Sequence, residues 1–290
     1  MNIDPIIEEA QKRMSNEQPS VPVIIRPSGN PASRSGLLRL LVIPFAIYCL
    51  WMIVTALFEG DLRLFLSADS RSIIVYTVFA CIITGMILPV YCIRESFVTG
   101  AVNMFQIGFW PVRRTFYACF LTIFFGYMAM VLFSPFEMDQ SAFGYAFLLL
   151  LPTAIASVMV CWVLLGTHVQ AFVRGGGTVL SIAAGSLITA WLFCITSFAH
   201  SPPVHLQPAL VGFLVLGLAA AIFFFAIRDI YAASIFVAFG LTFVMADRIG
   251  ISGMQAVMPA VYCSALLGVI TLIGIHLYFV RNFRTVKLPA

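Results

Sequence analysis

The sequence predicts an all-α protein, a polytopic transmembrane helix bundle of about eight spans with a polar N-terminal cytoplasmic tail. Of its 290 residues, 61% are hydrophobic and only 10% are charged, against roughly 45–50% apolar and about 25% charged in soluble domains. From residue 36 onward the chain is a series of apolar runs of membrane length. These runs are continuously apolar, which favours helices, because the strands of a membrane barrel alternate apolar and polar residues.

The two ends of the chain differ from the part between them. Residues 1–35 are polar and rich in proline, and they lack the apolar density that would offset the entropy of ordering. We expect a cytoplasmic tail here. It is not a secretory signal peptide, because acidic residues and prolines precede the first apolar run. Residues 281–290 form a second, short cytoplasmic tail.

Eight apolar runs in residues 36–280 are the predicted spans, since a helix needs about 20 residues to cross the hydrocarbon layer. They run approximately over 36–58, 72–93, 115–134, 143–166, 178–199, 208–227, 230–247 and 256–280. One boundary is weakly marked. The stretch 208–247 would be about 60 Å long as one helix at 1.5 Å per residue, so we predict a hairpin at Arg228 and Asp229, although no Gly or Pro stands there.

The basic residues predict the orientation, because short cytoplasmic loops retain Lys and Arg. With both termini inside, the translocated loops contain only Arg63, Arg71 and Arg248, and the other thirteen of the sixteen basic residues lie on the cytoplasmic side. The same assignment places Glu59 in a translocated loop. Compact loops and the lack of a cleavable signal favour the cytoplasmic membrane of a prokaryote.

The segment 94–114 is longer and less apolar than the other connections. We expect it to lie along the cytoplasmic interface, with Trp110 at headgroup depth. It is either an ordinary interfacial connector or a surface that docks a partner. The residues that would form the interfacial or docking surface are Phe105, Phe109, Trp110, Arg113 and Arg114.

Titratable groups inside a membrane are the best general indicator of function. Here every Asp, Glu, Lys and Arg is expected near a span end or in a loop, which leaves His168 and His276 as weak candidates for holding a cofactor. Haem is not expected. One His on each of two helices gives the number of axial ligands that a haem needs, but nothing in the sequence places them on opposite faces of one macrocycle. The seven cysteines stand singly, and His200 and His205 have no adjacent Cys or carboxylate, so we predict no metal site.

Catalytic patterns are weak. Gly250-Ile251-Ser252-Gly253 resembles the G-x-S-G motif of rhomboid intramembrane proteases, which pair the serine with a histidine on another helix. The only downstream histidine, His276, lies about 36 Å further along the same predicted helix, too far for a hydrogen bond. A basic, glycine-rich turn at residues 174–177 is better explained as a flexible connection than as a phosphate loop. The sequence therefore argues against an enzyme.

Residue size suggests which spans are central. Ala183, Ala184, Gly185 and Ser186 give the fifth span the smallest face, so we expect it at the centre of the bundle. The phenylalanines of the third and sixth spans indicate helices that face lipid or a partner. With 27 Phe in all, the chain has more apolar surface than a compact core would bury, and we expect bound lipid.

Two function classes remain. The favoured one is a non-catalytic subunit or scaffold of a membrane protein complex, which packs against other membrane protein subunits. The alternative is a transporter or channel for a neutral or lipid-like solute. A net charge of +4 is too small to indicate nucleic-acid binding.

Overall fold

The computed structural model describes residues 34–62, 69–98, 102, 104–133, 140–196, 198–199, 207–245 and 254–283. Several sequence predictions fall outside these residues: the tail up to residue 33, the C-terminal tail from residue 284, His200, His205 and the segment around Ser252. The side chain of Phe105 is also outside the described set.

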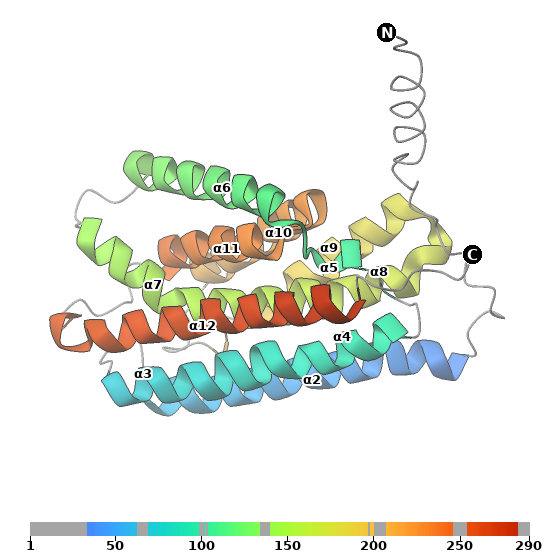
Figure 1. Ribbon diagram of the computed structural model, residues 1–290, viewed down its shortest axis with the longest axis horizontal. Helices are drawn as coiled ribbons and strands as arrows, with labels where there is room; N and C mark the ends of the chain where they lie inside the picture. The colour runs from blue at the N-terminus through green and yellow to red at the C-terminus, as the bar shows by residue number, and fades with distance from the viewer. Residues whose placement is uncertain are drawn as a thin grey trace, which may run out of the picture. The chain divides into compact units, whose positions relative to one another are not determined.

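The described chain is helical throughout its regular structure, and the predicted all-α fold class is confirmed (Figure 1). Two spans combine α-helical and π-helical turns. The second contains α3 (Ser70–Tyr76), η1 (Thr77–Ile87) and α4 (Leu88–Val98), and the fourth contains α7 (Gln140–Ser157), η2 (Val158–Gly166) and α8 (Thr167–Val173). The other elements are α2 (Arg34–Leu62), α5 (Met104–Ile107), α6 (Val112–Phe133), η3 (Arg174–Gly176), α9 (Thr178–Thr196), α10 (Gln207–Ile227), α11 (Ile230–Met245) and α12 (Met254–Phe283).

Within the described residues, seven helical runs are long and apolar enough to cross a membrane. The remaining predicted span, 230–247, corresponds to α11, which is shorter, with 16 residues. That length is about 24 Å of helix at 1.5 Å per residue, somewhat less than the hydrocarbon thickness of about 30 Å. The helices are those of a multi-pass membrane protein.

The centre of the bundle is the fourth span, and the expectation that it would be the fifth is wrong. In the most apolar stretch of residues 142–176, 89% of the residues are buried, against 39% in the fifth span. Every residue of η2 is buried. A helix enclosed on all sides must be apolar on all sides, and η2 carries no charged side chain. The small residues of the fifth span instead allow one close contact: a Cβ on Gly185 would lie 3.0 Å from Gln170 Cγ.

The third span, α6, lies at the edge of the bundle and packs on α11 (Figure 1). Only 11% of its most apolar stretch is buried, and Phe120 and Phe124 are exposed, as its phenylalanines predicted. The sixth span differs from the expectation, because Phe224 and Phe225 of α10 point into the core. A run of consecutive phenylalanines places rings on several helix faces, so composition alone could not assign them.

The predicted hairpin at Arg228 and Asp229 is present between α10 and α11. Arg228 has a φ of 56°, the left-handed conformation that glycine usually supplies in such turns. Its backbone N–H donates to the Phe224 carbonyl and closes the end of α10. The Asp229 carboxylate accepts the Ala232 N–H at 3.0 Å and caps the N-terminus of α11. These two residues therefore make the turn without Gly or Pro.

Candidate functional site

Polar side chains gather at both ends of the bundle. At the end predicted to be cytoplasmic, several segments meet at Arg228. Its guanidinium donates to the Gln106 carbonyl at 3.1 Å and to the Gln170 side-chain oxygen at 2.9 Å. The Trp110 indole N–H donates to the Arg228 carbonyl oxygen. The Arg228 turn thus connects the 94–114 segment, the fourth span and the α10–α11 hairpin.

The charges of this turn are held by hydrogen bonds inside the protein. Asp229 is fully buried and accepts a hydrogen bond from the Thr115 hydroxyl at 2.8 Å, in addition to its capping bond. Burial lowers the pKa of the Arg228 guanidinium to about 10, because removal from water disfavours its charged form. Gly108 fits tightly here: it has a φ of +90°, and a Cβ would lie 2.7 Å from the Arg228 oxygen. These contacts hold several segments together and indicate a structural role.

The 94–114 segment folds against the end of the bundle. Phe109 is 5% exposed and stacks on His276, with ring centroids 4.8 Å apart. The Phe109 side chain is therefore buried against the bundle and does not form an exposed interfacial surface. Among the predicted docking residues whose side chains are described, Arg113 and Arg114 are exposed, and the Arg114 guanidinium lies 3.5 Å from the centroid of the Trp110 ring. The docking role of this segment stays a prediction.

The two candidate histidines make separate contacts. His168 is fully buried; its Nδ1 lies 2.6 Å from the Leu164 carbonyl oxygen and its Nε2 lies 2.6 Å from the Ser96 hydroxyl. His276 Nδ1 pairs with the Tyr231 hydroxyl at 3.0 Å. Because both ring nitrogens of His168 are engaged within the chain, this arrangement does not suit an axial haem ligand.

Metal binding has no obvious centre in the described part of the chain. Nowhere in it do three His, Cys, Asp or Glu side chains come together where they could hold a metal ion.

The other end of the bundle contains a buried carboxyl group that the sequence assignment had placed in a loop. That assignment was wrong for Glu59: α2 continues to Leu62, and Glu59 is 0% exposed. The Tyr76 hydroxyl donates to Glu59 Oε1 and lies 3.0 Å from the Thr153 hydroxyl. Cys81 Sγ is 3.8 Å from the same Thr153 oxygen. We call Glu59, Tyr76, Cys81 and Thr153 the Glu59 cluster.

The members of the Glu59 cluster lie at different distances from the ends of their helices. Glu59 is the last residue of the first candidate span, and α2 ends three residues later at Leu62. At 1.5 Å per residue, Tyr76 is about 9 Å beyond the start of the second span, and Thr153 is about 17 Å beyond the start of the fourth. A neighbouring pair, Thr77 and Ser264, joins the second and last spans through hydroxyls 2.5 Å apart. Ser264 is about 12 Å inside its span by the same measure. The Glu59 carboxyl, near the end of its own helix, is thus enclosed by side chains that lie further inside the neighbouring spans. An ionisable group buried among membrane helices is a functional-site hypothesis by default.

Unpaired polar atoms continue from this cluster into the core. Thr55 Oγ1, one helical turn before Glu59, is buried without a hydrogen-bond partner, as are Trp162 Nε1 and Gln170 Nε2. Thr153, Trp162 and Gln170 follow one another along the central fourth span at intervals of about 12–14 Å. A buried polar group without a partner costs roughly 1–3 kcal/mol, so each calls for an explanation.

The fold and these sites together define a multi-pass helical membrane protein with a carboxyl group buried among its helices. Comparison with protein-family models, with curated proteins and with solved structures finds no match to this chain.

Sequence reasoning missed Glu59 because it ended the first span at residue 58. One signal was available: Thr55 and Glu59 are four residues apart, so they share a helix face directly after a long apolar run. No Gly or Pro separates Glu59 from that run, and the helix had no local reason to stop before it.

Proposed function

We propose that the protein transports a small neutral solute across the membrane and that Glu59 is the group that binds and releases a coupled proton. The observation that carries this proposal is the complete burial of the Glu59 carboxyl between the first, second and fourth spans. An ionisable group buried among membrane helices is costly to keep, so a carboxyl enclosed in this way points to a functional use.

The surroundings of Glu59 suit both of its protonation states. The described polar groups near it include Tyr76 and Cys81 of the second span, Thr153 of the fourth and Thr55, one turn earlier on its own helix. When Glu59 is ionised, the Tyr76 hydroxyl donates to it. When Glu59 is protonated, its O–H can donate to the Tyr76 oxygen, while Tyr76 donates to Thr153. The hydrogen bonds between Glu59, Tyr76 and Thr153 can thus be kept, with reversed direction, when a proton arrives or leaves.

The polar groups beyond the cluster favour a neutral solute. The unpaired atoms along the core are a hydroxyl oxygen, an indole nitrogen and an amide nitrogen, and none carries a charge. Such groups can hydrogen-bond to a passing uncharged solute or to water, and this would offset the cost of leaving them unpaired.

Carbodiimides test the proton-binding role directly. Dicyclohexylcarbodiimide partitions into the membrane and reacts with protonated carboxyl groups, whereas a water-soluble carbodiimide reacts with exposed ones. We expect the membrane-soluble reagent to modify Glu59 and the modification to decline as the pH rises. The matched control is Glu95, an exposed carboxylate on α4, which the water-soluble reagent should modify instead. Peptide mass spectrometry reports both sites.

A carboxyl that exchanges a proton must become accessible during the cycle. Failure of dicyclohexylcarbodiimide to modify Glu59 in membranes at any pH would therefore contradict the proposal. In proteoliposomes containing a pH-sensitive dye, a gradient of a transported neutral solute should move protons with the wild-type protein and with Glu95→Gln. It should not do so with Glu59→Gln. Equal proton movement in the Glu59 variant would exclude coupling through this residue.

A second candidate function, the non-catalytic subunit, is favoured by α6. This helix gives little of its surface to its own bundle and exposes several aromatic side chains. A photoreactive amino acid at Phe124 should form one defined cross-link to another membrane protein, while the same probe at Ile270 of α12, also exposed, should not. Lipid adducts alone at both positions would argue against a subunit that docks through α6.

A further inference from the structure

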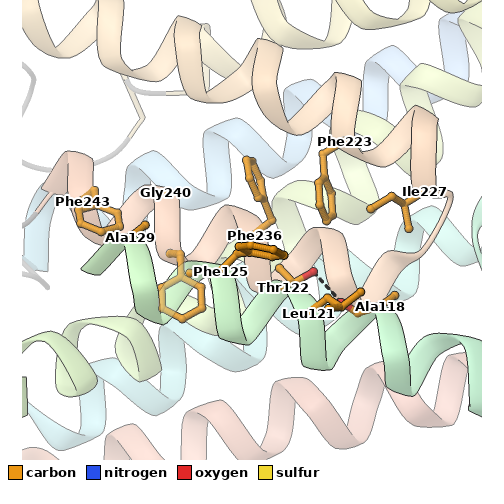
Figure 2. Close-up of a pocket in the computed structure, with 12 residues that line it drawn as sticks. Ala118, Leu121, Thr122, Phe125, Ala129, Phe223, Ile227, Phe236, Gly240 and Phe243 are labelled. Atoms are coloured by element: carbon orange, nitrogen blue, oxygen red, sulfur yellow. Dashed lines mark hydrogen bonds between the residues drawn. The ribbon is translucent and has the colours of Figure 1, made fainter. Parts of the chain in front are cut away.

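An apolar groove separates α6 from the α10–α11 hairpin, and it is independent of the Glu59 cluster (Figure 2). Its volume is about 510 Å³, within the range of roughly 300–1,000 Å³ that is usual for small-molecule sites. One wall is a helical stripe of α6, and the opposite wall comes from both helices of the hairpin. Representative lining residues are Ala118, Phe125 and Ala129 on α6, Ile227 on α10, and Phe236 and Phe243 on α11.

The groove offers hydrocarbon contacts along its length. The wall formed by the hairpin includes Phe223 and Phe236, whose rings stack with centroids 4.7 Å apart. The one hydroxyl among its lining side chains, that of Thr122, donates to the Ala118 carbonyl of the same helix, as the dashed line in Figure 2 shows. A polar or charged ligand body would find no side-chain partner among these lining residues. The occupant therefore has an apolar portion that fills the groove.

One end of the groove carries a fixed positive charge. Arg114 lies one helical turn before Ala118, and its Nη2 donates at 2.9 Å to the carbonyl of Ile227, which lines the groove. The guanidinium also stacks on Trp110 and is exposed. These two contacts position the Arg114 guanidinium at the end of the groove. A guanidinium has five N–H donors, so donors remain beyond the one that bonds to Ile227.

We propose that this groove binds one anionic phospholipid, with an acyl chain between α6 and the hairpin and the phosphate on Arg114. Arginine matches phosphate geometry through paired N–H donors. Trp110 marks the headgroup depth at which such a phosphate lies. The charge pattern of the loops predicts that this end faces the cytoplasm, where anionic lipids are held by basic residues near the surface.

Native mass spectrometry of the delipidated, detergent-solubilised protein tests the proposal. The two probes are phosphatidylglycerol and phosphatidylcholine with identical acyl chains. We expect the wild-type protein to retain one phosphatidylglycerol at least tenfold more tightly than phosphatidylcholine, which corresponds to about 1.4 kcal/mol. Arg114→Gln should abolish that preference. Arg113→Gln, a neighbouring exposed arginine on the same helix, should retain it.

A second pair of variants tests the groove rather than the charge. Ala129→Phe should fill the groove and release both lipids, whereas Ile123→Phe, on an exposed part of α6 outside the lining, should release neither. If Ala129→Phe does not fold, the arginine pair still decides the question. Equal retention of the two lipids indicates ordinary contact with the bilayer and overturns the proposal. Equal losses in the Arg113 and Arg114 variants indicate general surface charge and overturn it too, as does a protein chain found in the groove.

Discussion

The Arg228 turn allows a prediction in which two opposing effects can be weighed. Arg228→Gly removes the side chain and also relieves the left-handed backbone at φ 56°. The relief is worth roughly 1–2 kcal/mol, because glycine has no Cβ to clash in this conformation. The loss comprises the two guanidinium hydrogen bonds, to the Gln106 carbonyl and the Gln170 side chain. Hydrogen bonds to charged groups contribute about 1.5–3 kcal/mol each.

The side-chain loss exceeds the backbone relief, so Arg228→Gly should destabilise the protein by roughly 1–5 kcal/mol. Thermal unfolding in detergent, with size-exclusion chromatography as the readout, should show a Tm lower by several degrees. In soluble domains of comparable size, the Tm falls by about 2–4 °C for each kcal/mol of lost stability. Arg113→Ala is the control, because Arg113 is exposed on α6, and its Tm should stay within about a degree. A Tm at or above that of the wild type in Arg228→Gly would refute the reasoning and show that backbone strain outweighs the hydrogen bonds.

Three further predictions concern packing, a buried histidine and topology. Gly85→Ala should lower stability by about 1–3 kcal/mol, because the new Cβ would lie 2.5 Å from the Ala156 Cβ. The control is Gly144→Ala, whose Cβ would have nothing within 4 Å; it should leave stability unchanged or raise it in the same melting assay. His168→Leu should cost about 1–3 kcal/mol, because the ring's hydrogen bonds with the Ser96 hydroxyl and the Leu164 carbonyl are lost. His168→Gln should cost less, because an amide can both donate and accept. Reporter fusions should place both termini in the cytoplasm; a fusion at residue 290 that was active only outside would contradict the eight-span orientation.

The sequence by itself determined the class of protein and most of its helices. Long apolar runs without alternation predict membrane helices, because the backbone N–H and C=O groups of a segment in lipid must form their hydrogen bonds within that segment. The same local logic located the α10–α11 hairpin, since Arg228 and Asp229 are the only polar break in a stretch too long for one crossing. It also identified α6 as a peripheral helix, because a surplus of large apolar side chains has to face lipid or a partner.

Only the tertiary structure decided which helix is central and which polar groups are buried. The small residues of the fifth span indicated close packing, but close packing on one face does not make a helix central, and η2 of the fourth span is enclosed on every side. Glu59 and Tyr76 are distant from Thr153 in sequence, and their contact depends on how three spans pack. Local periodicity has no information on such long-range neighbours, so the candidate site emerged from packing, while the membrane fold was already determined by composition.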